Sequence, residues 1–347
     1  LGNIKWMLPR SFASLWMTLI CAFFTACSTT KNLPEGEILY TGIDKLEVVN
    51  EDKTLAGVTA LTEVEAALAY APNNAILGSS SLRWPIPFGL WVYNGFEKYQ
   101  DKKGVGRWIF DHLGKSPVLM SSVNGETRAK VATNLLRDYG YFNGSVSYQE
   151  VPQKNPKEAK VSYVIDMAQP YFLDSIAYLR YPHNADSLIR STHSQSVLKS
   201  GENFSVLKLE EERQRLSSLF RNHGYYYYRP EFTTYRADTL QKPGYVSLQV
   251  VPRNGVPTEA RKQYYIGKTS VYLTGYNDEP PTDTLRLRTM DIYYNGKKPG
   301  IRPSALMRNF FFRKGELFSQ DRQTFTQEAI ARMGVFRYSE FRYEPKD

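Results

Sequence analysis

The sequence predicts an α+β protein built from small repeated domains, each with the order strand, helix, helix, strand, strand. Two observations predict this class. Aromatic residues make up 14% of the 347 residues and are mainly 25 Tyr and 18 Phe, a balance that favours strands. A helical pattern also ends three times in a glycine that leads into aromatic or apolar residues, at Gly140, Gly224 and Gly334. The chain is long enough for two or three such domains.

The beginning of the chain has the pattern of a targeting segment. Two basic residues precede an uncharged stretch at residues 11–26, which is too short for a good transmembrane helix but is typical of a signal peptide. Small residues directly before Cys27 resemble a lipobox, the site at which signal peptidase II cleaves. We therefore expect a lipoprotein signal peptide at residues 1–26, lipidation of Cys27 and a polar tether at residues 27–36. An ordinary secretory signal that happens to contain a cysteine is the alternative.

Cysteine content and charge limit the chemistry. The two cysteines are Cys21, inside the expected signal peptide, and Cys27, so we expect no disulfide and no cysteine-based metal site in the mature domains. The net charge of +9 permits an anionic partner but does not demand one, and the basic residues form no long run. Nucleic acid is therefore not an expected partner.

The three glycines predict helix ends. Each fits the position after a helix at which a left-handed residue closes the last turn, and apolar residues recur at helical spacing before it. Ser205 and Ser319 occupy matching positions in the second and third repeats, where each is expected to cap the following helix. Three consecutive glutamates, at residues 210–212, are expected on the solvated face of their helix.

The remaining pattern divides the chain into three domains, at residues 37–168, 169–260 and 261–347. Strands are expected at residues 160–165, 171–178, 245–250 and 290–294, and shorter helices at residues 184–198 and 304–312. The first domain contains a long insertion at residues 74–111. In the third domain, residues 336–343 are expected to form the second strand, and the domain is expected to be incomplete because a third strand is absent.

The repeated unit, with Gly-Tyr-Phe at its last helix-to-strand junction, resembles the POTRA domain of the BamA/TamA outer-membrane assembly superfamily. The polar tether behind Cys27 is similar to that of the lipoprotein TamA-like proteins of Bacteroidetes (TamL). The resemblance covers residues 27–347. It implies tandem POTRA-like domains, each a small mixed sheet packed on two helices, and a carboxy-terminal β-barrel beyond the last domain, absent from this chain.

The resemblance also implies a location and partners. The domains are expected to face the periplasm, anchored to the outer membrane through lipid on Cys27. Expected partners are unfolded outer-membrane proteins, a TamB-like periplasmic partner and the chain's own C-terminal barrel. No covalent chemistry is required of such an arm.

The sequence contains no pattern typical of a catalytic or metal-binding site. The four histidines have no metal-ligand spacing, and the sequence contains no metalloprotease, Walker or nucleophile-elbow motif. We expect no catalytic residue, no metal and no cofactor.

One segment has more aromatic surface than a single buried strand face requires. Residues 225–228 are four consecutive tyrosines, and the aromatic pattern continues to Tyr235, so we expect a sticky strand at a sheet edge. Such an edge suits the capture of an extended polypeptide by strand addition. Contact with a neighbouring domain is the alternative. The candidate binding residues are Tyr226, Tyr228, Thr233, Thr234 and Tyr235.

A second candidate surface lies in the insertion. Residues 84–93 are apolar, are interrupted by proline and include Trp84 and Trp91. They suit a membrane-surface loop or a partner loop, or simply a cover over an enlarged core.

The sequence thus predicts a periplasmic, lipid-anchored arm of an outer-membrane protein assembly or translocation barrel. A free-standing outer-membrane lipoprotein that binds glycan or protein is the alternative from another class. An enzyme is the third hypothesis, which an acid-base pair in a cleft of the structure would favour.

Overall fold

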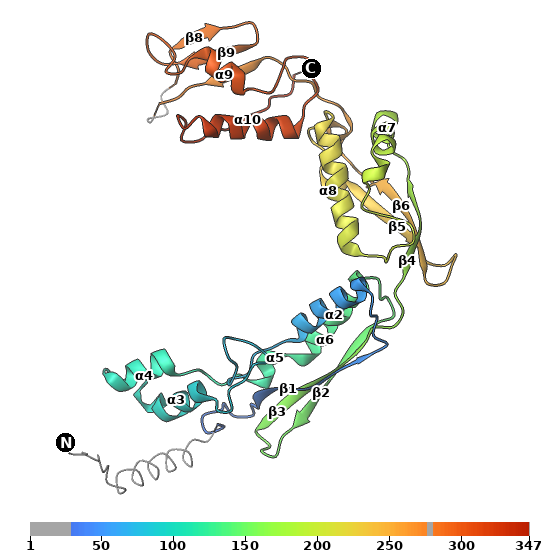
Figure 1. The fold of residues 1–347 in the computed structure, drawn as a ribbon. Helices are drawn as coiled ribbons and strands as arrows, with labels where there is room; N and C mark the ends of the chain where they lie inside the picture. Colours follow the sequence, from blue (N-terminus) through green and yellow to red (C-terminus); the bar gives the residue numbers. More distant parts are fainter. Residues whose placement is uncertain (1–28, 276–279, 347) are drawn as a thin grey trace, which may run out of the picture. The chain divides into compact units, whose positions relative to one another are not determined.

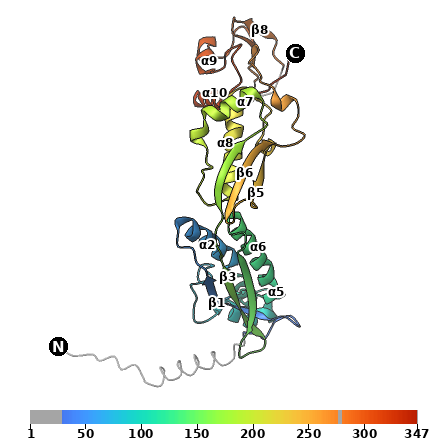
Figure 2. The same cartoon turned by 90° about the vertical axis from the view of Figure 1, so that its right-hand side faces the viewer.

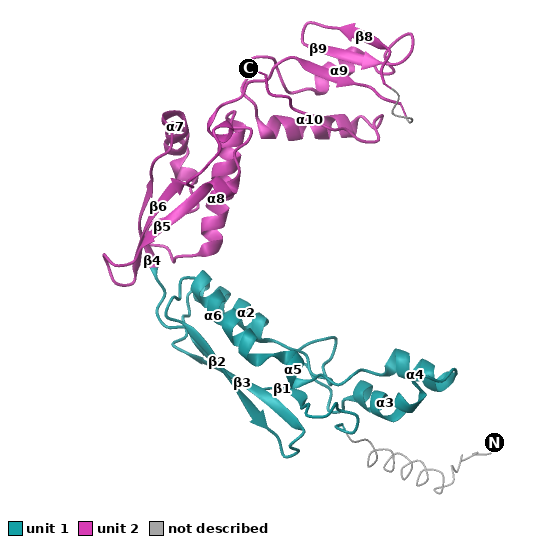
Figure 3. Cartoon of the chain, turned by 180° about the vertical axis from the view of Figure 1, so that it is seen from behind, with its two compact units in different colours: residues 1–171 teal, residues 172–347 magenta. Residues whose placement is uncertain are grey.

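The computed structural model describes residues 29–275 and 280–346, so Cys27 and the predicted signal peptide lie outside the described residues. The chain divides into two compact units, Leu1–Tyr171 and Phe172–Asp347 (Figure 3). The described strands form three separate three-stranded sheets, one in the first unit and two in the second (Figure 1). This arrangement confirms the predicted α+β class with small mixed sheets. The domain limits at residues 168 and 260 stay predictions.

The first sheet has its last strand in the middle. In spatial order the strands are β1 (Leu39–Val49), β3 (Glu158–Asp166) and β2 (Ser145–Pro152). β3 runs parallel to β1 and antiparallel to β2. Alternate β3 side chains, including Val161, Tyr163 and Ile165, are buried, because successive residues of a strand point to opposite faces.

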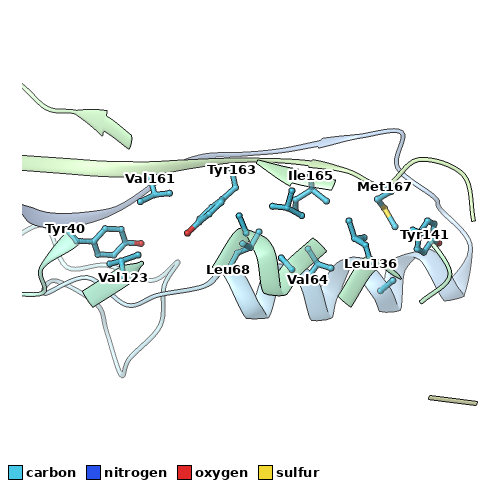
Figure 4. Packing of buried hydrophobic residues seen from close by; sticks show 14 of the residues in the cluster. Tyr40, Val64, Leu68, Val123, Leu136, Tyr141, Val161, Tyr163, Ile165 and Met167 are labelled. Carbon is cyan, nitrogen blue, oxygen red and sulfur yellow. The ribbon is translucent and has the colours of Figure 1, made fainter. Parts of the chain in front are cut away.

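Two helices cover the inner face of this sheet. They are α2 (Leu55–Leu68) and α6 (Gly125–Asp138), and Figure 4 shows their apolar residues packed against those of β3. Val64 and Leu68 are fully buried one turn apart on α2, and Leu136 is fully buried on α6. The Thr54 hydroxyl accepts a hydrogen bond from the Gly57 amide (3.2 Å) and so caps α2.

The insertion between α2 and α6 is helical. Its elements are α3 (Phe88–Phe96), the 3-10 turn η1 (Glu97–Tyr99) and α4 (Val105–Leu113), followed by the short α5 (Met120–Val123). Proline and glycine interrupt the periodicity of these segments, so the sequence did not indicate α3 or α4.

The second sheet repeats the arrangement of the first. In spatial order its strands are β4 (Phe172–Tyr178), β6 (Tyr245–Pro252) and β5 (Thr233–Asp238). The helical elements are α7 (His183–Ser191), η2 (His193–Gln195), α8 (Val206–Asn222) and η3 (Pro230–Phe232). Figures 1 and 2 show α8 lying along this sheet. The predicted strands at residues 171–178 and 245–250 are thereby confirmed.

The prediction of one aromatic strand from residue 225 to residue 235 is wrong. Residues 225–228 form turns, η3 follows, and the strand begins only at Thr233. The aromatic side chains here pack onto α8: the Tyr225 and Tyr228 rings lie 5.6 and 4.6 Å from the Phe220 ring. Helix packing, rather than strand formation, accounts for this part of the aromatic run.

The third sheet has the same spatial arrangement but a different chain order. Its strands, in spatial order, are β7 (Thr269–Tyr272), β9 (Met290–Tyr294) and β8 (Asp283–Arg286). All three precede α9 (Pro303–Asn309) and α10 (Gln320–Arg332), so a hairpin takes the positions that β5 and β6 hold in the second sheet. The expected strand at residues 336–343 is wrong, because these residues have no strand assignment and β9 already holds the central place.

One pairing recurs in all three repeats. The segment before the last helix pairs antiparallel with the start of the first strand region, through the bridges Leu39↔Leu119, Phe172↔Asn203 and Tyr265↔Leu317. The recurrence identifies the region that leads into β7 as the counterpart of the starts of β1 and β4. It also covers one outer edge of each sheet at its beginning.

The predicted helix ends are confirmed. Gly140, Gly224 and Gly334 follow α6, α8 and α10, and their φ angles are 91°, 96° and 66°, in the left-handed region that glycine adopts without strain. The Tyr141 and Tyr225 amides donate to carbonyls of the preceding turn, at Leu136 (2.9 Å) and Phe220 (3.1 Å). Ser319 caps α10 through its hydroxyl, whereas Ser205 holds the cap position of α8 without a side-chain bond.

Candidate functional site

The candidate site is the outer edge of β5 in the second sheet. β5 is bonded to β6 on one side, and within the described residues no strand pairs with its other side. Arg236 and Ala237 are exposed there, and Tyr235 is half-buried. An unpaired edge of this kind offers backbone donors and acceptors to another extended chain.

The register identifies which amides point outward. The Arg253 amide donates to the Phe232 carbonyl (2.7 Å), so Thr233 opposite Pro252 forms a non-hydrogen-bonded pair. Alternation then directs the amides of Thr233, Tyr235 and Ala237 away from β6. Those of Thr234 and Arg236 face β6. Pro252 has no N–H group, and its place in a non-hydrogen-bonded pair means that β5 loses no hydrogen bond there.

Three of the predicted binding residues are buried or half-buried. Tyr228 and Thr233 are 6% and 1% exposed, and their hydroxyl groups are 2.9 Å apart in a hydrogen bond. Their side chains therefore stabilise the contact between the sheet and α8. Thr234 is half-buried, and strand alternation places its side chain on the opposite face of the sheet.

Tyr235 is tied to α8. Its hydroxyl donates to the Leu209 carbonyl (2.5 Å), and the Arg213 guanidinium lies 5.2 Å from its ring centre. Burial raises the pKa of the Tyr235 hydroxyl well above its usual value. The side chain thus holds β5 against the helix, while its backbone amide remains directed outward.

Tyr226 contacts the last repeat rather than the open edge. Its ring lies 4.9 Å from that of Phe318 and 5.0 Å from that of Tyr343, and the Tyr227 ring lies 5.3 Å from that of Tyr264. These contacts agree with the alternative that part of the aromatic run packs on a neighbouring domain.

A buried charge cluster joins α8 to β4 of the second sheet. Glu212 on α8 is fully buried and forms an ion pair with Arg215 (2.6 Å). Its carboxylate also accepts hydrogen bonds from the Tyr178 hydroxyl (2.6 Å) and the Val197 amide (3.1 Å). The expectation of a solvated face for residues 210–212 is therefore wrong at Glu212. No local pattern indicates this role, because Tyr178 and Val197 come from segments separate from α8.

A cavity of about 280 Å³ lies where β4 and β6 end. Aromatic residues and three arginines are among its lining residues: Tyr181, Phe220, Tyr228, Arg180, Arg253 and Arg261. Arg261 is oriented by two bonds to the Val256 carbonyl (3.1 and 2.7 Å), and Arg180 adopts a left-handed φ of 65°. The lining suits a small apolar group with an anionic end.

The remaining predicted residues lie elsewhere. Trp84 precedes α3 and is 62% exposed, whereas Trp91, on α3, is half-buried. Cys27 lies outside the described residues, so its lipidation stays a prediction.

The described residues give no sign of a metal centre or a membrane span. Across residues 29–275 and 280–346, no group of three or more His, Cys, Asp or Glu side chains is placed to hold a metal ion. Over the same ranges, no helix has both the length and the apolarity to cross a bilayer.

The described repeats define a class of protein with tandem small mixed sheets, each packed on helices. No family model and no curated protein matches the chain. Among solved structures, the chain is similar to POTRA domains 3–5 of BamA from Haemophilus influenzae, with 10% identity, a TM-score of 0.36 and coverage of 91% of this chain and 94% of that one.

Two cyanobacterial proteins are also similar. The match to POTRA domains 1–3 of the periplasmic domain of Omp85 from Anabaena has 12% identity, a TM-score of 0.27 and 88% coverage of each chain. The match to the N-terminal domain of Omp85 from Thermosynechococcus elongatus has 13% identity, a TM-score of 0.25 and coverage of 90% of this chain and 93% of that one. These TM-scores are low, and the sheet order of the chain itself defines its fold.

Proposed function

We propose that this chain is the periplasmic, lipid-anchored arm of an outer-membrane protein assembly or translocation barrel. In this proposal the arm binds extended segments of unfolded outer-membrane proteins, or a TamB-like periplasmic partner, by adding them as a strand. The observation that carries the proposal is the outer edge of β5, where outward amides alternate along an exposed strand. The tandem repeats and the lipobox-like sequence before Cys27 support the location.

Strand addition suits a carrier of many substrates. Backbone N–H and C=O groups supply the affinity, and they are the same in every extended chain. The outward-facing backbone N–H and C=O groups belong to alternate residues of β5, here Tyr235 and Ala237. On an added strand, the backbone groups that face β5 also belong to every second residue, so the two sets match. The edge therefore binds an extended segment without reading much of its sequence, and no covalent chemistry is needed.

A proline substitution tests the edge. Thr233 is a poor target because its side chain is buried and hydrogen-bonded, so Ala237, which is exposed and has an outward amide, is preferred. Ala237→Pro removes one donor and places a ring at the edge while keeping the ladder to β6. We expect binding of a denatured outer-membrane protein segment to weaken by roughly tenfold or more, as a lost hydrogen bond and a steric block together predict.

Two controls locate the site. Ala237→Val keeps the amide and should bind like the parent. Glu150→Pro removes an outward amide from β2, the open edge of the first sheet, and should leave binding unchanged. If Ala237→Pro retains its circular dichroism and its full affinity, β5 is not the binding edge, and loss of binding in Glu150→Pro would move the site to β2.

The anchor has a separate test. Cys27→Ala should abolish incorporation of a palmitate analogue and change the processing of the chain, because the modified thiol is gone. Equal labelling of the variant and the parent would contradict lipidation at Cys27.

The alternative function is a free-standing outer-membrane lipoprotein that binds glycan or protein. The arginine-lined cavity in the second repeat is the observation that favours it. A coding sequence for a barrel beyond Asp347 would favour the assembly arm, and a stop codon there would favour the alternative.

A further inference from the structure

The insertion in the first repeat displays an exposed apolar surface. Trp84 and Phe88 are each 62% exposed, Val105 is 76% exposed and Trp108 is 56% exposed. α4 buries none of its residues, and Val105, Trp108 and His112 share one of its faces by their helical spacing. Large side chains gathered on one insertion need an explanation beyond the scattered apolar residues of an ordinary surface.

α3 and α4 form a helical hairpin, defined here as residues 84–115. The Tyr93 and Phe110 rings pack with their centres 5.2 Å apart, and the Lys115 amide donates to the Gly89 carbonyl (2.9 Å). The start of α3 is therefore beside the end of α4, and Figures 1 and 3 show the two helices side by side at one end of the first unit. The hairpin is a built element and not a loose loop.

The chain that follows Cys27 is fixed to this hairpin. Asn94 on α3 is 7% exposed, and its side-chain amide donates to the Thr29 carbonyl (3.2 Å). Asn32 in turn donates to the Asn94 carbonyl (3.2 Å). Only two peptide units separate Cys27 from Thr29, so their Cα atoms lie within about 7 Å of each other. A lipid on Cys27 would therefore hold the C-terminal end of α3 within roughly 15 Å of the bilayer surface.

The charge of the hairpin suits an anionic lipid surface. Residues 84–115 contain five Lys or Arg residues, at Lys98, Lys102, Lys103, Arg107 and Lys115, against three acidic residues, at Glu97, Asp101 and Asp111. Each basic side chain near an anionic bilayer contributes favourable energy, and exposed Trp and Phe are the residues that enter the headgroup region.

We propose that the α3–α4 hairpin lies in the interface of the membrane to which Cys27 is tethered, with Val105 and Trp108 inserted among the headgroups. This inference rests on the lipid anchor of the proposed function. The tether and the hairpin then act together: the lipid holds the chain at the membrane, and the hairpin fixes how the first unit is oriented on it. The short path from Cys27 to Asn94 favours a lipid surface over a soluble protein as the occupant.

Tryptophan fluorescence reports on this surface directly. The chain beyond Cys27 contains three tryptophans, Trp84, Trp91 and Trp108, and all three lie in the hairpin. In acylated protein reconstituted into vesicles with brominated acyl chains, a variant that retains only Trp108 should be quenched strongly. A variant that retains only the half-buried Trp91 should be quenched less. Equal emission from Trp108 in brominated and ordinary vesicles would overturn the proposal.

A second measurement separates the hairpin from the anchor. The chain from residue 27 onward, carrying Cys27→Ser, is added to vesicles that contain phosphatidylglycerol. We expect it to partition weakly, and the double variant Val105→Ser, Trp108→Ser should partition roughly tenfold less, because two exposed apolar side chains no longer enter the interface. Val131→Ser is the matched control, since it removes an exposed valine from α6.

The outcomes are distinguishable. Partitioning that depends on Val105 and Trp108 supports the hairpin even if Cys27 proves unacylated, in which case only the anchor fails. Partitioning that is absent, or equal in the double variant and in Val131→Ser, overturns the membrane contact even when Cys27 is acylated.

Discussion

Glu212 is buried although the sequence pattern around it predicts a solvated position. Three consecutive glutamates on a helix predict a solvated stripe, yet Glu212 is fully buried and accepts bonds from Arg215, Tyr178 and Val197. A buried carboxylate is tolerated only when its acceptor positions are filled, and here side chains and backbone from three segments fill them. The cluster therefore fixes β4, the loop after η2 and α8 to one another.

Removing one partner of this pair should be costly. Arg215→Ala leaves the Glu212 carboxylate buried without its cation, and we expect the free energy of unfolding to fall by about 3–5 kcal/mol. Arg190→Ala, which breaks the exposed pair with Asp186, should change it by less than about 1 kcal/mol. Urea unfolding of both variants checks the difference, and equal effects would contradict a structural role for the cluster.

The buried tyrosines predict a loss of stability at high pH. Burial raises the pKa of Tyr228 to about 12, above the value of about 10 in an unfolded chain. The unfolded state therefore releases this proton first, so stability is intact below pH 10 and falls as pH rises from about 10 to 12. Unfolding measured across this range should show a smaller loss in Tyr228→Phe than in the parent. An identical slope would mean that the hydroxyl titrates normally.

At the scale of elements, the glycines at the helix ends differ in their surroundings. Gly224 is buried, and a Cβ atom added there would lie 2.7 Å from a terminal methyl of Leu317 in the last repeat, whereas one added at Gly334 would meet nothing. Both have left-handed backbone, so alanine is strained at either position.

The pair gives a graded prediction. Gly334→Ala should destabilise the chain by roughly 1–2 kcal/mol through backbone strain alone. Gly224→Ala should cost more, because it adds the contact with Leu317 and disturbs the bond from the Tyr264 amide to the Gly224 carbonyl (2.8 Å). Thermal or urea unfolding of the two variants decides the order, and a larger effect at Gly334 would contradict the packing at Gly224.

Residues 336–343 provide a second prediction at this scale. They have no strand assignment, so their amides should exchange with solvent faster than those of β5 that face β6. If these residues gain a partner from sequence beyond Asp347, an extended chain should slow their exchange. Slow exchange in the present chain would show that the last repeat already protects them.

For the whole molecule, locally determined features were the predictable ones. The helix ends at Gly140, Gly224 and Gly334 depend on φ angles that glycine alone adopts easily, and the central strands β3 and β6 show a plain alternation of buried residues. These features were enough to predict small mixed sheets in tandem.

The limits and the order of strands depend on pairing between residues far apart in the sequence, and these features were not predictable from local patterns. Residues 225–232 are aromatic enough for a strand, but the β5 ladder begins only at Thr233, opposite Pro252. Tyr225 and Tyr228 pack on α8 instead, and Tyr226 and Tyr227 contact the last repeat. The central place in the third sheet went to β9, which precedes both helices, and no local pattern ranks β9 above residues 336–343. At the candidate site, β5 lies at a sheet edge, as the resemblance implied, but Tyr228 and Thr233 belong to the core, and binding at this edge stays a prediction.

Amide-resolved hydrogen exchange during binding tests the central claim most directly. The chain is saturated with a peptide from an unfolded outer-membrane protein, and exchange is compared with that of the free chain. We predict that the outward amides of Tyr235 and Ala237 become protected, because they now donate to the added strand, while the amide of Arg236, already bonded to β6, changes little. Binding that leaves Tyr235 and Ala237 exchanging as in the free chain would contradict strand addition at β5.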